Sequence, residues 1–198
     1  MNEKSKGPLI VGFGHRRRVG KDTLAGMVRD RLNEAGIRVS RDAFAWKLKD
    51  VARKVFDYAG LGPADLYERE PERREIVLPA IGKTPRQIWI EMGNALRSVA
   101  PDVWIRGVLD NPAYDSGCVL LISDVRYPNE VDAIRERGGM LVKITRAGIP
   151  ESSDVADSAL AGMPDDEWDY RIPNDRGLDE LAAMADWLAG VIPNRRRK

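Results

Sequence analysis

A short apolar run that leads into a glycine-lysine loop constrains the fold more than any other segment. Residues 8–13 (PLIVGF) are apolar, too short for a helix and close to glycine, so they predict a buried strand. Beyond Lys21, apolar residues recur at helical spacing as far as residue 35. The sequence therefore predicts a strand, a turn of backbone N–H groups and a helix whose N-terminus faces that turn. Such an arrangement favours an anion, above all phosphate.

The loop between this strand and this helix reads GFGHRRRVGKDT over residues 12–23. Lys21 stands where a lysine would reach the terminal phosphates of a nucleotide. The strict pattern G-x-x-x-x-G-K-[ST] is not met, because His15 takes the place of the first glycine and Asp22 that of the hydroxyl residue. We expect His15 to pack within the loop rather than to act as a ligand or a base. The candidate ATP-binding loop consists of Gly14, His15, Arg16, Arg18, Val19, Gly20, Lys21, Asp22 and Thr23.

The rest of the chain alternates strand-like and helix-like segments. Strands are predicted over 37–44, 118–122, 140–145 and 168–172, and helices over 45–59, 84–100, 104–109, 128–137 and 178–192. This alternation predicts a three-layer α/β fold, a mostly parallel five-stranded sheet flanked by helices, with ligands at the carboxyl ends of the strands. Residues 60–82 are polar and punctuated by prolines, which predicts a mobile insert.

One domain can accommodate these elements. We expect a core of residues 7–44 and 117–192, a helical insert at about 45–112, a lid-like loop at 146–166 and a basic tail at 193–198. The lid segment has an alternative interpretation as an ordinary surface loop.

Composition excludes several classes of function. One cysteine and one histidine leave no disulfide framework, no cysteine-based zinc site and little room for a Ser-His or Cys-His triad. The charges balance, with 32 basic and 31 acidic residues, so bulk charge gives no support for a nucleic-acid partner. No apolar run reaches the roughly 18 residues that a membrane span needs, and the first residues are polar. We therefore expect no membrane partner and a cytoplasmic location.

A second polar group follows the strand-like run 118–122 (CVLLI). Asp124 would end this strand beside the first one, close to a magnesium-nucleotide, and Arg126 follows at the same edge. The alternatives are a turn or helix cap for Asp124 and a surface ion pair for Arg126.

The run DVRYPNEVDAIRERGGMLVKITR over residues 124–146 resembles the deoxynucleoside monophosphate kinase family of tailed bacteriophages. Other segments agree with it in order along the chain: GKDT at the end of the loop, Phe44-Ala45 before Leu48-Lys49, KTPRQIWIEMGNALR with PDVW over residues 83–104, and Pro173-Asn174-Asp175 before Gly177. Two departures concern base specificity. Ser158-Ala159 lacks the acid of the family's Ser-Glu, and Ile90 or Glu91 stands near the place of a frequent glutamine.

The resemblance implies a P-loop kinase fold with a helical substrate-binding insert, and transfer of phosphate from ATP, with Mg²⁺, to a deoxynucleoside monophosphate. The catalytic residues it implies are Lys21, Arg126, Arg86 and Asp124. Further ATP contacts would come from Arg146, Asn174 and Asp175. The substrate-binding set would be Phe44, Lys49, Arg86, Glu91, Arg97, Trp104 and Arg126, with Trp104 having an alternative role in the core.

Magnesium would be held through water by Asp124 and Asp22, whereas Thr23 would contact phosphate first. The family suggests a homodimer and, for a phage protein, the cytoplasm of the host. Two other functions stay open from the residues: a P-loop kinase acting on a hydroxyl with Asp124 as base, and a non-catalytic nucleotide-binding module whose basic tail contacts nucleic acid.

Overall fold

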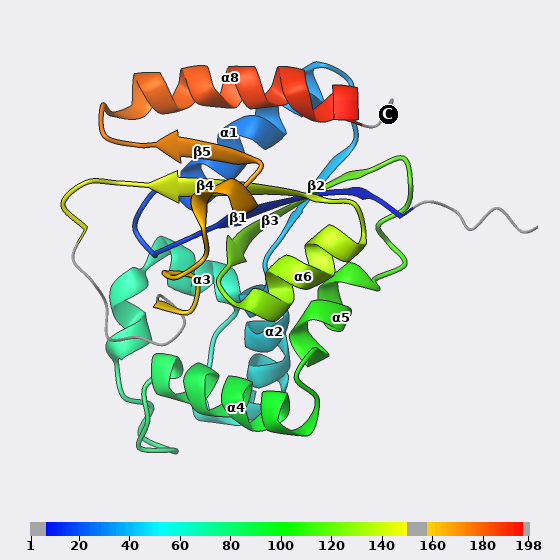
Figure 1. Ribbon diagram of the computed structural model, residues 1–198. Helices are drawn as coiled ribbons and strands as arrows, with labels where there is room; N and C mark the ends of the chain where they lie inside the picture. Colours follow the sequence, from blue (N-terminus) through cyan, green and yellow to red (C-terminus); the bar gives the residue numbers. More distant parts are fainter. Residues whose placement is uncertain (1–6, 150–157, 196–198) are drawn as a thin grey trace, which may run out of the picture. The chain divides into compact units, whose positions relative to one another are not determined.

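The computed structural model describes residues 7–149 and 158–195. The chain divides into two compact units, which are described separately (Figure 1). Unit 1 comprises residues 1–43 and 112–198, and unit 2 comprises residues 44–111. The expected lid, 146–166, includes residues 150–157, which lie outside the described residues. Residues 196–198 of the expected tail lie outside them as well.

Unit 1 is built on a five-stranded sheet whose strands are all parallel. The strands are β1 (Leu9–Gly14), β2 (Val39–Asp42), β3 (Val119–Val125), β4 (Met140–Thr145) and β5 (Tyr170–Pro173), in the order β2-β3-β1-β4-β5. Gly14 is paired with Val125 and with Lys143, so the first strand ends between the carboxyl ends of β3 and β4. The predicted parallel sheet flanked by helices is confirmed.

The helices of unit 1 form a layer on each face of this sheet (Figure 1). Helices α1 (Lys21–Glu34) and α8 (Leu178–Arg195) cover one face, where Val11 and Phe13 join their apolar residues in one buried cluster. Helix α6 (Pro128–Glu136) covers the other face, since a Cβ on Gly12 would meet Ile134 Cδ1 at 2.7 Å. Burial of each large side chain in these layers contributes about 1.5–3 kcal/mol.

Two boundaries of unit 1 differ from the sequence-based expectation. The strand predicted over 37–44 spans only Val39–Asp42, because the Asp42 carboxylate accepts the N–H of Ala43 at 2.7 Å and turns the chain. At the other end of the unit, α8 runs on to Arg195, so the first residues of the expected basic tail are helical. Arg195 is held there by an ion pair with Asp169 at 2.5 Å.

Unit 2 is helical. It contains α2 (Phe44–Phe56), α3 (Ala64–Arg69), α4 (Pro85–Val99) and α5 (Val103–Leu109), with 3₁₀ turns η1 (Asp57–Ala59) and η2 (Pro71–Glu75). The helix predicted over 84–100 is present as α4, with Thr84 as its cap residue. The Thr84 side chain accepts the N–H of Gln87 and the Gln87 side chain accepts the N–H of Thr84, a reciprocal cap followed by proline in the first turn.

Residues 60–82, predicted as a mobile insert, contain more regular structure than their prolines suggest. Pro63 immediately precedes α3 and Pro71 begins η2, positions where a missing backbone N–H costs no hydrogen bond. Tyr67 of α3 is 3% exposed and packs edge-on against Trp89 of α4, with ring centroids 5.0 Å apart. Packing of this aromatic pair secures the segment within unit 2.

Unit 1 also contains the short turn η3 (Asp165–Glu167), which precedes β5.

Among the described residues, no helix combines the length and the apolar character that a bilayer span requires.

Candidate functional site

The loop between β1 and α1 bends back on itself at three residues. His15 has a φ of 92°, Arg18 of 63° and Gly20 of 102°, all in the left-handed region that disfavours side chains. His15 therefore occupies the first glycine position of the strict motif with the same backbone geometry that makes glycine the usual choice there. Residues 15–20 form a strongly curved turn rather than an extended crossing.

Lys21 lies inside this curve. Its side chain is buried, with 5% of the residue exposed, and its ammonium donates to the carbonyl of His15 at 3.0 Å and to the carbonyl of Arg16. A buried ammonium is tolerated only where acceptors surround it. The loop thus folds around the Lys21 ammonium, the group that the sequence predicts to reach the terminal phosphates of a nucleotide.

A second loop, after β5, packs against the first. The Asn174 amide donates to the carbonyl of Val19 at 2.9 Å, and a Cβ on Gly20 would come within 2.5 Å of Asn174 Nδ2. The neighbouring Asp175 carboxylate accepts the N–H of Ala147 at 2.6 Å, which ties the end of β4 to the same corner. The structure brings Asn174 to the candidate phosphate loop and Asp175 to the segment that begins with Arg146.

The base of the loop rests on Trp168. This residue is 5% exposed, and a Cβ on Gly14 would meet its Cη2 at 2.5 Å. Lys143 lies over the indole at 6.0 Å from the ring centroid and is paired with Asp165 at 2.8 Å. Sequence reasoning missed Trp168 and Lys143, because nothing in a strand or turn pattern places them beneath a loop more than a hundred residues away.

His15 is neutral at physiological pH. Burial lowers its pKa to about 4, with further lowering by the charges of Lys143 and Arg16, against an opposing hydrogen bond to the backbone carbonyl of Ile144. Its Nδ1 is buried without a hydrogen-bond partner. An uncharged imidazole supplies no cationic contact for a phosphate, which agrees with the expectation that His15 packs within the loop.

The other residues of the predicted donor site differ in exposure, since Val19 is buried and Arg18 is exposed. Thr23 and Asp22 are exposed in the first turn of α1. The Asp22 carboxylate forms an ion pair with Arg41 of β2 at 2.7 Å, and the Arg41 side chain is only 19% exposed. Sequence reasoning missed Arg41.

Carboxylates gather at the carboxyl edge of the sheet. Asp124 is half-buried near the end of β3, the strand next to β1. Asp42 ends the neighbouring strand β2 and accepts the hydroxyl of Tyr114 at 2.6 Å. Burial and this hydrogen bond raise the pKa of Tyr114, so the phenol stays protonated as a donor. Within residues 7–149 and 158–195, no cluster of three or more His, Cys, Asp or Glu side chains could hold a metal by itself.

Arg126 follows β3 at the same edge, in the turn that leads into α6. The buried carboxylate of Glu130 accepts the backbone N–H of Arg126 at 2.7 Å and that of Tyr127 at 3.1 Å. Sequence reasoning missed Glu130, although an acid in the third position of a helix that starts with proline is a recognisable capping signal.

Unit 2 holds the rest of the predicted substrate-binding residues. The Lys49 ammonium lies over the Trp89 ring at 5.3 Å from its centroid, and Arg86 forms an ion pair with Glu75 at 2.5 Å. Phe44 and Trp104 are buried at 2% and 4% exposure. Trp104 donates through Nε1 to the carbonyl of Gly93 at 3.3 Å, which favours its alternative role in the core.

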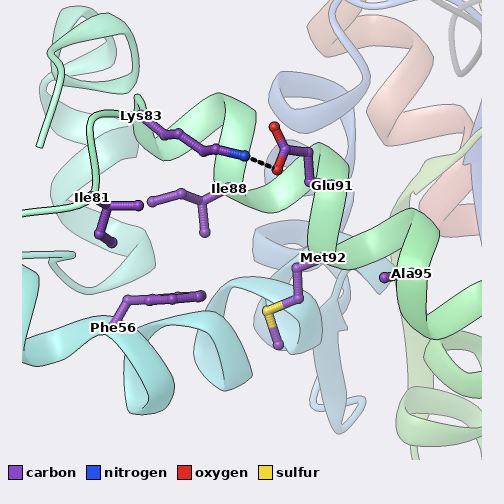
Figure 2. A pocket seen from close by; sticks show the side chains of 7 residues that line it. All are labelled: Phe56, Ile81, Lys83, Ile88, Glu91, Met92 and Ala95. Carbon is purple, nitrogen blue, oxygen red and sulfur yellow. Dashed lines mark hydrogen bonds and ion pairs between the residues drawn. The ribbon is translucent and has the colours of Figure 1, made fainter.

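A hollow of about 290 Å³ opens on another face of α4. Its walls are apolar except for an ion pair between Lys83 and Glu91 at the rim (Figure 2). The lining residues are Phe56, Ile81, Lys83, Ile88, Glu91, Met92 and Ala95. With about 3.6 residues per turn, Arg86 and Arg97 fall on the opposite face of α4 from Ile88 and Ala95. The structure therefore separates Glu91 from these two arginines within the predicted substrate-binding set.

Comparison with known proteins agrees with the family resemblance. No protein-family model matches the chain. The chain is similar to a protein of Acanthamoeba polyphaga mimivirus named "Putative deoxynucleotide monophosphate kinase", with 28% identity over 190 residues that cover 87% of this chain and 92% of the relative. The resemblance to deoxynucleoside monophosphate kinases is confirmed by this relative.

Similarity to solved structures is weaker. The crystal structure of APE1195 gives a TM-score of 0.47 at 12% identity and covers 96% of this chain and 97% of that one. The APS kinase CysC of Mycobacterium tuberculosis, solved with AMPPNP and APS, gives 0.40 at 16% identity, covering 97% and 99%. Likenesses at this level carry no functional inference.

Proposed function

We propose that this chain is an ATP-dependent kinase that converts deoxynucleoside monophosphates to diphosphates. The observation that carries the proposal is the curved loop of residues 14–23, folded around the buried ammonium of Lys21 at the junction of β1 and α1. The similarity to the mimivirus relative, which extends over most of both chains, supports the same activity.

The donor would be bound by this loop. Its curved backbone and the N-terminus of α1 favour a polyanion, and Lys21 would exchange its carbonyl partners for the terminal phosphates. Asn174 would support the loop from the side, through its bond to Val19. Arg146 and Asp175 lie at the corner where the base of the donor would be placed.

The residues present fit a magnesium ion that is shared with the nucleotide. Mg²⁺ usually keeps several waters and uses one or two carboxylates together with substrate phosphates. Asp124 at the edge of β3 and Asp22 in the first turn of α1 are the carboxylates that would hold it through water, and Thr23 would contact phosphate. When bound, the ion would neutralise charge on the transferred group.

The acceptor needs no base. A phosphate monoester has a second pKa of about 6, so it is already largely dianionic at neutral pH. What the reaction requires is neutralisation of two polyanions and their in-line alignment. Lys21, Arg126, Arg86 and Lys49 would supply this charge, with Arg97 as a further candidate.

The test is a panel of all common ribo- and deoxynucleoside monophosphates, together with hydroxyl acceptors such as sugars, assayed with ATP and magnesium by following ADP release. Phosphorylation of one or more deoxynucleoside monophosphates is expected. Turnover of hydroxyl acceptors alone would refute the proposal in favour of a kinase with Asp124 as base. ATP binding without turnover of any acceptor would refute it in favour of a nucleotide-binding module. Removal of residues 194–198 then tests the nucleic-acid partner of such a module, through the salt dependence of binding.

A further inference from the structure

We propose that Glu130 is a positioning residue that sets the place of the Arg126 guanidinium by holding the backbone from which this side chain projects. The inference rests on the proposed role of Arg126 at the acceptor phosphate. In this inference Glu130 does not contact the substrate. It affects kcat/KM for the acceptor by positioning Arg126.

Glu130 is a buried carboxylate that binds two backbone N–H groups. It is 3% exposed, and among the described residues it joins Lys21 and Ser123 as the buried polar side chains. One oxygen, Oε2, accepts both the N–H of Arg126 at 2.7 Å and the N–H of Tyr127 at 3.1 Å. Bonds between a carboxylate and backbone N–H groups are charge-assisted and stronger than neutral ones, which offsets the desolvation of the buried group.

Ordinary helix capping does not account for both bonds. An acid at the third position of a helix reaches back to the N–H of the cap residue, here Tyr127. Glu130 also accepts the preceding N–H, that of Arg126, and this bond is the shorter of the two. The second bond fixes a residue that lies outside the helix.

Arg126 lies between two fixed points. Val125 is held in the sheet by its pairing with Gly14, and Pro128 begins α6. The link between them consists of Arg126 and Tyr127, and a change in its backbone angles would displace the long Arg126 side chain. A misplacement of about 1 Å in a positioning group can lower the rate by about 10²-fold. Glu130 accepts the backbone N–H groups of both residues of this link and so holds it at the carboxyl edge of the sheet.

The experiment is a double-mutant cycle on the full chain. Glu130→Ala removes the acceptor oxygen, and Glu130→Gln keeps one. Each is made alone and combined with Arg126→Ala, and kcat and KM are measured for the accepted monophosphate and for ATP. Asp115→Ala serves as control, because it removes a carboxylate that accepts a backbone N–H from Gly117, before the amino end of β3.

Glu130→Ala is expected to lower kcat/KM for the acceptor by about tenfold or more, with KM for ATP changed less than about twofold. Glu130→Gln should recover most of the loss. In the Arg126→Ala background Glu130→Ala should add no more than about twofold, since residues that act as a unit are non-additive. Asp115→Ala should leave both KM values unchanged.

Failure of the premise and failure of the inference give different results. Wild-type acceptor kinetics in Arg126→Ala would refute the proposed role of Arg126, and the inference with it. A full additional loss from Glu130→Ala in that background, or an equal rise in KM for ATP, would refute the inference alone. Should Glu130→Ala not fold, Glu130→Asp, which keeps the charge but shortens its reach, is tested against Glu130→Gln. Equal kinetics for those two variants would also refute it.

Discussion

Replacement of Gly20 with alanine tests how the candidate phosphate loop is braced. The φ of 102° at Gly20 lies in the left-handed region, where a Cβ costs about 1–2 kcal/mol. The added Cβ would stand 2.5 Å from Asn174 Nδ2, so the Asn174 side chain must move. Its bond to the Val19 carbonyl, 2.9 Å long, would then be lost at about 1 kcal/mol. The free energy of unfolding is expected to fall by about 2–3 kcal/mol in total.

Two control variants separate these contributions in urea unfolding. Gly36 has a φ of 73°, and a Cβ added there would meet open space within 4 Å, so Gly36→Ala carries the conformational cost alone. Asn174→Ala removes only the hydrogen bond. Gly20→Ala should exceed Gly36→Ala by about 1 kcal/mol, and this excess should vanish in the Asn174→Ala background.

The same variants report on the donor site. Because Asn174 holds the loop that would carry the phosphates of ATP, Gly20→Ala should raise KM for ATP more than KM for the acceptor, and Gly36→Ala should change neither. If Gly20→Ala destabilised the protein no more than Gly36→Ala and left KM for ATP unchanged, the bracing of the loop by Asn174 would be refuted.

Two further predictions concern single residues of the loop. Lys21→Ala is expected to lower turnover by about 10²-fold or more while the far-ultraviolet circular dichroism stays native, because it removes the proposed charge partner of the transferred group. Near-normal turnover would contradict the proposed role. His15, the only histidine, has a pKa lowered from 6.5 to about 4 by burial, so the unfolded chain binds its proton first as the pH falls. The contribution of His15 to the free energy of unfolding should therefore be lost as the pH falls from about 6.5 to about 4. His15→Gln should flatten that part of the curve of stability against pH. An NMR titration of the His15 ring with a midpoint near pH 6.5 would contradict the lowered pKa of His15.

Local pattern was sufficient to predict the strand, loop and helix around Lys21. The apolar run before the loop and the helical spacing after it depend on neighbours in the chain, and the structure has β1 and α1 at these positions. The cap of α4 and the parallel sheet were predictable for the same reason. The family resemblance of residues 124–146 also required only the order of residues.

Segments whose structure depends on partners elsewhere were predicted less well. Residues 60–82 looked irregular because three prolines interrupt them. In the structure Tyr67 packs against Trp89, and Pro63 and Pro71 stand at the starts of α3 and η2. Strand β2 is shorter than predicted because the Asp42 side chain bonds the backbone and ends it.

By itself, the sequence determined which residues form the candidate phosphate loop, since its conformation depends on glycine, on lysine and on the flanking elements. Only the tertiary structure decided what supports that loop. Asn174 against Val19, Trp168 beneath Gly14 and Arg41 against Asp22 are contacts between segments distant in the chain. The contacts of Asn174 and Arg41 arise because parallel strands bring their carboxyl ends to one edge of the sheet, and no local pattern encodes which strands become neighbours there. Trp168 instead precedes β5, and its contact with Gly14 likewise depends on the sheet order, which places β4 between β1 and β5.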